Sequence, residues 1–103
     1  MILATKILFN VNQCQVEYSL KFKSNYIELY WNEIGVKTSS AQITHFYSEQ
    51  NLVGKQVIGV CNFPEKNIAG IKSQVLILGS IDKEGRVTLV HPSQKAENGL
   101  PIA

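Results

Sequence analysis

Residues 7–22 read ILFNVNQCQVEYSLKF, and the apolar alternation in this stretch changes phase part-way along it. Apolar side chains occupy every second position up to Val11 and again from Cys14 to Phe22, with the second series shifted by one residue. A change of phase near Gln13 predicts a bulge or a sharp bend within one long strand. Closing a small barrel requires a first strand that is curved and bulged in this way.

Further strands are predicted from alternation or from short apolar runs, over residues 27–31, 39–44, 57–61, 75–78 and 87–90. The runs 57–61 and 75–78 are apolar throughout, so we expect two central strands that are covered on both faces. The last strand follows Asp82-Lys83-Glu84-Gly85, which is typical of a hairpin connection.

One helix of about two turns is predicted between the third and fourth strands. Ser48 caps its start, Glu49 favours its first turn, and Gly54 closes it in a left-handed conformation. Three strands, a helix and two further strands are the order of an OB-fold, so the predicted class is all-β, a small OB-fold barrel with one short helix. An immunoglobulin-like sandwich stays open as an alternative, because Trp31 lies between the two cysteines.

Composition narrows the class of protein. The chain has 103 residues, 45% of them hydrophobic, and a net charge of only +2. These values exclude disorder and a strongly cationic nucleic-acid binder, and they predict one domain over residues 1–103. Cys14 and Cys61 are expected to be buried thiols of a reducing compartment. Lys6 interrupts the start too early for a signal peptide, and no apolar run approaches the roughly 20 residues that span a bilayer, so we expect a cytoplasmic protein without membrane insertion.

Two stretches are more particular than generic barrel sequence. The first is residues 33–44, EIGVKTSSAQIT, and the second is residues 52–64, LVGKQVIGVCNFP, which continues through 68–70 to 73–79. Together they resemble the CsaA family of export-related chaperones, which are relatives of the tRNA-binding OB domain of some methionyl-tRNA synthetases and of endothelial monocyte-activating polypeptide II. The resemblance covers residues 33–103, and Asn98-Gly99 fits the ending of the family.

The resemblance also has departures. The first strand of the family resembles Asp-Ile-Arg-Val-Gly-x-Ile, whereas residues 6–11 here are KILFNV, without the Asp, the Arg or the Gly. The synthetase-type domains carry a loop resembling Asn-Leu-Lys-Pro-Arg-Lys-Met-Arg-Gly-Val-x-Ser-x-Gly-Met. This sequence matches that loop at Asn62, Lys66, Gly70 and Ser73 and departs from it at Asn67, Ile68, Val75 and Leu76. The pattern favours the CsaA branch.

What the resemblance implies is a homodimer of OB-folds with no catalytic site and no cofactor. Members of the CsaA branch are described as binding unfolded or export-bound polypeptides, and their relatives bind tRNA by structure more than by sequence. The leading hypothesis is therefore a polypeptide-binding chaperone linked to protein export, and the alternative is a structure-specific tRNA-binding protein.

Two clusters are candidates for RNA or peptide binding. The loop 62–73 presents cations and amide groups to phosphates or to exposed backbone, although spacing alone favours a solvated connection. A second set interleaves lysines with aromatic residues, although the aromatic side chains of such a strand pair more often lie in the core. The candidate binding residues are Lys21, Lys23, Lys37, Asn62, Lys66 and Ser73.

The termini carry the candidate dimer interface. Ile2, Leu3, Leu100 and Ile102 are apolar residues at the chain ends, and a symmetric interface would cover them. Frayed tails are the alternative. His45 and His91 accompany no nucleophile, paired carboxylates or metal-ligand spacing, so the sequence predicts neither an enzyme nor a metal site.

Overall fold

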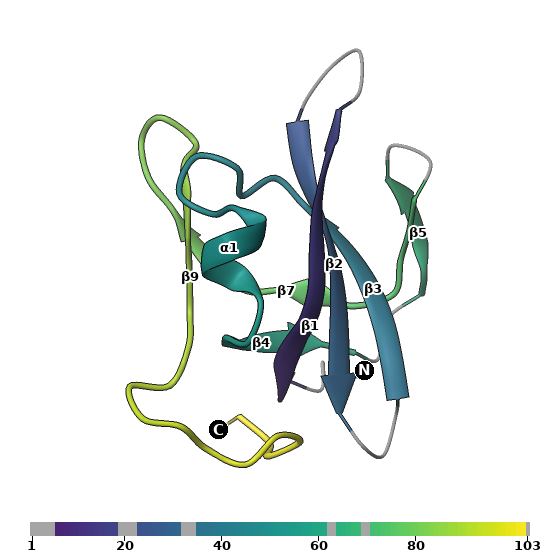
Figure 1. Cartoon of the computed structure of the whole chain (residues 1–103), viewed down its shortest axis with the longest axis vertical. Coiled ribbons are helices and arrows are strands. Elements are labelled where there is room, and N and C mark those ends of the chain that lie inside the picture. Colours follow the sequence, from purple (N-terminus) through teal and green to yellow (C-terminus); the bar gives the residue numbers. More distant parts are fainter. Residues whose placement is uncertain (1–5, 19–22, 32–34, 62–63, 69–70, 103) are drawn as a thin grey trace.

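The computed structural model describes residues 6–18, 23–31, 35–61, 64–68 and 71–102 (Figure 1). Three consecutive antiparallel strands form its centre: β1 (Lys6–Tyr18), β2 (Lys23–Trp31) and β3 (Gly35–Ala41). β4 (Gln56–Val60) pairs with the first part of β1, and β7 (Leu76–Ile77) pairs with β4. The order of strands in this sheet is β3-β2-β1-β4-β7.

The predicted bulge in the first strand is confirmed. Val11 pairs with Leu29 and Gln13 pairs with Glu28, so the register shifts by one residue between Val11 and Gln13. Before the shift β1 pairs with both β2 and β4, and after it β1 pairs with β2 alone. The bulge therefore marks the place where one long strand turns from one side of the barrel to the other.

The barrel closes between β3 and the segment that precedes β7. The Gln74 N–H donates to the Thr38 carbonyl at 2.8 Å, and the Thr38 N–H donates to Gln74 Oε1 at 3.1 Å. A five-stranded antiparallel barrel with a helix between its third and fourth strands is an OB-fold, as the strand order predicted.

The helix α1 (Glu49–Leu52) lies where it was predicted but is only one turn long. Its first turn begins after Ser48, whose N–H donates to Asn51 Oδ1 at 2.7 Å. Gly54 has a φ of 89°, and its N–H donates to the Val11 carbonyl at 2.9 Å. The expected second turn is absent because the chain pairs with the bulge of β1 directly after Leu52, which is buried.

Several boundaries differ from the predictions. The third strand covers residues 35–41 instead of 39–44, and Ile43 lies after it as a buried loop residue. β4 is buried as predicted, but the expectation for 75–78 is wrong: β7 has two residues, and Leu76 is 54% exposed. The last strand, β9 (Val87–Leu89), pairs with β8 (Gly79–Ile81) across the predicted turn.

The core gathers side chains from both sides of the barrel and from the helix. Trp31 packs against its edge, and Cys61 carries a half-buried thiol, whereas the Cys14 side chain lies outside the described part. No helix in the described ranges is long and apolar enough to cross a membrane. The buried cluster consists of Val11, Ile27, Leu29, Ile43, Leu52, Val57, Val75 and Leu89.

Candidate functional site

The segment 62–73, predicted as a loop, contains a small hairpin. β5 (Lys66–Ile68) pairs with β6 (Ile71–Ser73), so that Lys66 lies opposite Ser73 and Asn67 opposite Lys72. The hairpin is fixed to β3, because Thr38 Oγ1 donates to the Lys72 carbonyl at 2.9 Å. Lys66, Asn67 and Lys72 are exposed. The hairpin that carries the two lysines thus lies beside β3, as Figure 1 shows for β5.

Ser73 has a different role from the one expected. It is only 4% exposed, and its hydroxyl accepts the Ser40 N–H at 3.3 Å and donates to the Val75 carbonyl at 3.5 Å. A hydroxyl in this position cannot reach a ligand on the surface. Its contacts instead hold β6 against β3, so Ser73 positions the hairpin that carries Lys66 and Lys72.

The outward face of β2 and β3 lies beside this hairpin. Ile27 and Leu29 are fully buried, so the residues that alternate with them on β2 belong to the other face. On that face Tyr30 lies opposite Val36, and these side chains are 41% and 50% exposed. In OB-folds the corresponding strands and their flanking loops bind oligonucleotides and oligosaccharides. We refer to the set Tyr26, Glu28, Tyr30, Val36, Thr38 and Ser40 as the outer face.

Lys37 does not belong to the outer face. It lies opposite Leu29 in the register and is half-buried, so it belongs to the inward series together with Ser39. Lys37 therefore faces away from Tyr30 and Val36, and its role in binding stays a prediction. Of the other candidate binding residues, Lys23 lies on β2 with a side chain outside the described part, and Lys21 and Asn62 fall outside the described ranges.

Tyr30 and Val36 are the exposed apolar residues of the outer face that sequence reasoning did not select. The sequence did indicate that Tyr30 faces outward, because Tyr30 alternates with Ile27, Leu29 and Trp31, which were predicted to face the core. The strand that holds Val36 was predicted to begin four residues too late, at Ser39 instead of Gly35. The predicted strands therefore did not include Val36, which the structure places on β3.

The C-terminal segment is held against the barrel. Gln56 Oε1 accepts the Ala96 N–H at 3.0 Å, and Gln56 Nε2 donates to the Ala96 carbonyl and to Asn98 Oδ1. Gly99, with a φ of 90°, lies so close to the Trp31 indole that a Cβ there would be 1.8 Å from Nε1. The segment 96–99 is therefore anchored and not a frayed tail.

The predicted dimer residues lie partly beyond this anchor. Leu100 is 44% exposed and Ile102 is half-buried, whereas Ile2 and Leu3 fall outside the described residues. An exposed leucine directly after an anchored segment has a fixed position on the surface. It is thus available to a second subunit in a defined geometry.

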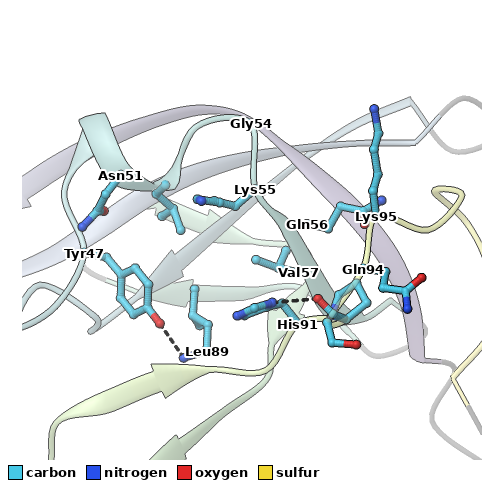
Figure 2. A pocket seen from close by; sticks show the side chains of 13 residues that line it. Tyr47, Asn51, Gly54, Lys55, Gln56, Val57, Leu89, His91, Gln94 and Lys95 are labelled. Atoms are coloured by element: carbon cyan, nitrogen blue, oxygen red, sulfur yellow. Dashed lines mark hydrogen bonds between the residues drawn. The ribbon is translucent and has the colours of Figure 1, made fainter.

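A pocket of about 440 Å³ lies between α1, the start of β4 and the C-terminal segment (Figure 2). The Tyr47 hydroxyl accepts the Leu89 N–H at 2.8 Å and fixes one wall. Sequence patterns did not indicate this pocket, because its walls come from two stretches that are far apart along the chain. Its lining residues are Tyr47, Asn51, Leu52, Gly54, Lys55, Gln56, Val57, Leu89, His91, Pro92, Ser93, Gln94 and Lys95.

Comparison with known proteins finds a family and related sequences, and it also finds similar solved structures. A family described as putative tRNA-binding domain matches residues 25–101. The methionine–tRNA ligase of Chlorobium limicola is 42% identical over 62 residues, which are 60% of this chain and 9% of the ligase. That of Porphyromonas gingivalis is 32% identical over 69 residues, 67% of this chain and 10% of the ligase. The chain thus spans about a tenth of the length of these curated relatives.

Two solved structures resemble this one over nearly the whole chain. The chaperone CsaA from Bacillus anthracis str. Ames has a TM-score of 0.92 and 35% identity, covering 97% of this chain and 91% of that chain. The CsaA chaperone protein from Picrophilus torridus has a TM-score of 0.87 and 34% identity, covering 100% of both chains.

Proposed function

This chain belongs to the family of putative tRNA-binding domains and resembles CsaA proteins, and on this premise we propose that it is a non-enzymatic chaperone of unfolded or export-bound polypeptides. The proposal takes residues 1–103 as one OB-fold domain that acts in the cytoplasm as a homodimer. The observation that carries it is the outer face, where Tyr30 and Val36 lie side by side and are both about half exposed.

The chemistry of the outer face fits an extended polypeptide. Two exposed apolar side chains next to each other offer a contact for the apolar side chains of an unfolded chain. The β5–β6 hairpin adds Lys66 and Lys72 at one edge, where they attract acidic segments. A net charge of +2 leaves most of the binding energy to apolar contact, so the affinity for polypeptide is expected to depend weakly on salt.

The second candidate is structure-specific tRNA binding. It is favoured by the family itself and by the β5–β6 hairpin, which holds Lys66 and Lys72 at the Thr38 edge of the outer face that also exposes Tyr30. Cations and exposed aromatic rings on one surface hold phosphates and stack bases. An affinity based on these lysines falls steeply as the salt concentration rises, since phosphate binding releases counterions.

A competition titration at several salt concentrations separates the two candidates. A labelled unfolded precursor polypeptide and a labelled tRNA are each titrated with the wild-type protein and with Tyr30→Ala, Lys66→Ala/Lys72→Ala and Lys83→Ala. Lys83 is the control, because it lies in the β8–β9 turn, which Figure 1 shows on the side away from β5.

The chaperone proposal expects polypeptide binding that is lost in Tyr30→Ala and is nearly independent of salt. A steep salt dependence of tRNA binding that becomes flatter in the double lysine variant, with no binding of polypeptide, would select the second candidate. Equal loss in Lys83→Ala would show that neither surface is specific. A sedimentation mass of one chain would contradict the homodimer.

A further inference from the structure

The pocket shown in Figure 2 is built from other elements than the surface assigned to polypeptide. None of its lining residues belongs to β2, β3, β5 or β6. Its volume of about 440 Å³ lies within the range of about 300 to 1,000 Å³ that is typical of small-molecule sites. It is large enough for one nucleotide and too small for a folded partner.

The floor of the pocket is apolar. Leu52, Val57 and Leu89 border it and belong to the buried core, so their positions are fixed by the packing of the barrel. The Tyr47 ring stands at one side, held by the hydrogen bond of its hydroxyl to the Leu89 N–H. A rigid apolar floor with an aromatic wall suits a flat ring system.

The charged groups at the pocket are all of one sign. Lys55 and Lys95 line it, and none of the lining residues is an Asp or a Glu. The chain as a whole has nearly balanced charges, with 10 Lys and Arg against 8 Asp and Glu, so the balance at the pocket differs from that of the molecule. A concave surface lined by one sign of charge concentrates ligands of the opposite sign.

Hydrogen bonds within the protein occupy two side-chain amides of the pocket and one ring nitrogen of its histidine. Asn51 uses Oδ1 for the Ser48 N–H and Nδ2 for the Phe46 carbonyl, and both polar atoms of the Gln56 amide are engaged with the C-terminal segment. His91 Nδ1 lies 2.9 Å from the Pro92 carbonyl, to which it can only donate, so Nε2 is the ring atom left to meet a ligand. Nε2 accepts from a phosphate hydroxyl when the ring is neutral and donates to a phosphate oxygen when the ring is protonated.

The two cations differ in direction. Figure 2 shows the Lys55 side chain extending over the pocket toward Asn51, whereas the Lys95 side chain points away from the other lining residues. The His91 ring lies beside Leu89 in the same view. A phosphate bound near Lys55 and His91 would leave the apolar floor for the group that carries it.

We propose that this pocket binds a nucleoside monophosphate, with the phosphate held by Lys55 and His91 and the base resting on the floor formed by Leu52, Val57 and Leu89. A polypeptide is a poorer occupant, because two of the side-chain amides that line the pocket, those of Asn51 and Gln56, already have protein partners. The same chemistry is offered by a free mononucleotide and by the phosphorylated 5′ end of an RNA chain.

Isothermal titration of the full chain with adenosine 5′-monophosphate tests the proposal. Adenosine and inorganic phosphate are each expected to bind at least tenfold more weakly, because each lacks half of the contacts. Lys55→Ala is expected to weaken binding about tenfold, which is the usual scale for one charge-assisted hydrogen bond. Lys55→Met, which keeps the apolar stem, gives the same loss if the ammonium is responsible.

Lys95→Ala is the matched control, since it removes the same charge from the same pocket but from a side chain that points outward. It is expected to weaken binding less than Lys55→Ala does, because Lys95 adds to the positive potential of the pocket but does not contact the phosphate. Equal losses in Lys55→Ala and Lys95→Ala would overturn the proposal, because they would indicate diffuse surface charge. Absence of heat up to millimolar nucleotide, with the wild-type chain folded by circular dichroism, would overturn it as well.

The source of the nucleotide is decided by RNA oligomers with and without a 5′ phosphate. Competition by the phosphorylated oligomer alone assigns the pocket to an RNA end, and competition by neither assigns it to a free mononucleotide.

Polypeptide binding at the outer face is measured in parallel, with and without saturating nucleotide. The two functions can then fail separately, because Tyr30→Ala affects only the outer face and Lys55→Ala only the pocket. Displacement of the nucleotide by unfolded polypeptide would contradict the proposal.

Discussion

Thr38 and Gln74 bond to each other in both directions, across 36 residues of sequence, and in one direction a side chain takes the place of the backbone. The Gln74 N–H donates to the Thr38 carbonyl at 2.8 Å. The return bond runs from the Thr38 N–H to Gln74 Oε1 at 3.1 Å, and Thr38 Oγ1 lies 3.3 Å from the same oxygen. The barrel is thus closed at this point by these bonds and not by a regular ladder of strand pairs.

Gln74→Ala is expected to weaken this closure while leaving the backbone bond in place. Removing Oε1 leaves the part-buried Thr38 N–H without its partner, and the free energy of unfolding should fall by about 1 kcal/mol. Urea unfolding measures this change. Gln42→Ala is the control, because Gln42 is exposed and lies after the end of β3, and it should have little effect. Equal effects of the two variants would mean that the side chain of Gln74 adds nothing to closure.

Gly99→Ala is expected to detach the C-terminal segment from Trp31. Gly85→Ala is its control, since Gly85 also has a positive φ but has open space where the Cβ would stand. Both variants carry the cost of a left-handed alanine, about 1 to 2 kcal/mol. Gly99→Ala adds a steric clash and should lower the free energy of unfolding by a further 1 kcal/mol or more, on the scale of about 1 to 3 kcal/mol for overpacking.

Trp31 reports this change directly, because it is the single tryptophan of the chain. Its emission should shift to longer wavelength in Gly99→Ala and stay unchanged in Gly85→Ala. An unchanged spectrum together with equal stability of the two variants would show that the indole does not pack on Gly99.

Gln56→Ala is expected to loosen the C-terminal segment without unfolding the barrel. The variant removes the bonds to Ala96 and Asn98, and local opening of the segment becomes more frequent. Cleavage after Lys95 by a lysine-specific protease should then be at least several-fold faster. Cleavage after Lys83, in the same digest, is the internal control. An unchanged rate after Lys95 would contradict the anchoring role of Gln56.

The turn between β8 and β9 gives a pH-dependent contribution to stability. Asp82 accepts the Arg86 backbone N–H at 2.9 Å, the Arg86 Nε at 2.7 Å and the Glu84 N–H at 3.0 Å. These bonds, the Arg86 backbone bond first, lower the pKa of Asp82 below its ordinary value. A lowered pKa in the folded state stabilises the fold above the unfolded value of about 3.9, and this contribution is lost as the pH falls through the folded pKa.

Asp82→Asn should therefore melt at a lower temperature than the wild-type chain at pH 7, and the difference should shrink as the pH falls below 4. Arg86→Ala is the companion variant, because it removes the guanidinium but keeps the backbone N–H. It should retain most of the pH dependence. Melting curves followed by circular dichroism between pH 7 and pH 2.5 measure both. A constant difference between Asp82→Asn and wild type across this range would refute the assignment.

Sequence patterns predicted those features of the fold that depend on residues close together in the chain. The change of apolar phase near Gln13 indicated the bulge, and Ser48 and Gly54 marked the ends of the helix. Each of these features follows from a few neighbouring residues. The length of α1 could not be predicted in this way, because the chain after Leu52 turns to hydrogen-bond with Val11, a partner that is distant in sequence.

The features that sequence patterns missed depend on contacts between distant residues. Ser73 was a plausible ligand contact in a loop, but its burial follows from the packing of β6 on β3. The pocket depends on the bonds of Gln56 to Ala96, 40 residues away, which hold the segment that forms one wall. The apolar periodicity around Gln56 and around Ala96 does not predict such a contact.

The anchored C-terminal segment has a consequence for the order of folding. The meander β1–β2–β3 joins strands that follow one another in the chain, whereas Ala96 and Gly99 contact Gln56 and Trp31, which lie much earlier in the sequence. Contacts between distant parts of a chain form late and slow the reaction, so docking of this segment should be the final step of refolding. Trp31 packs against the core as well as against Gly99, so its fluorescence would reach the native value only when this last step is complete.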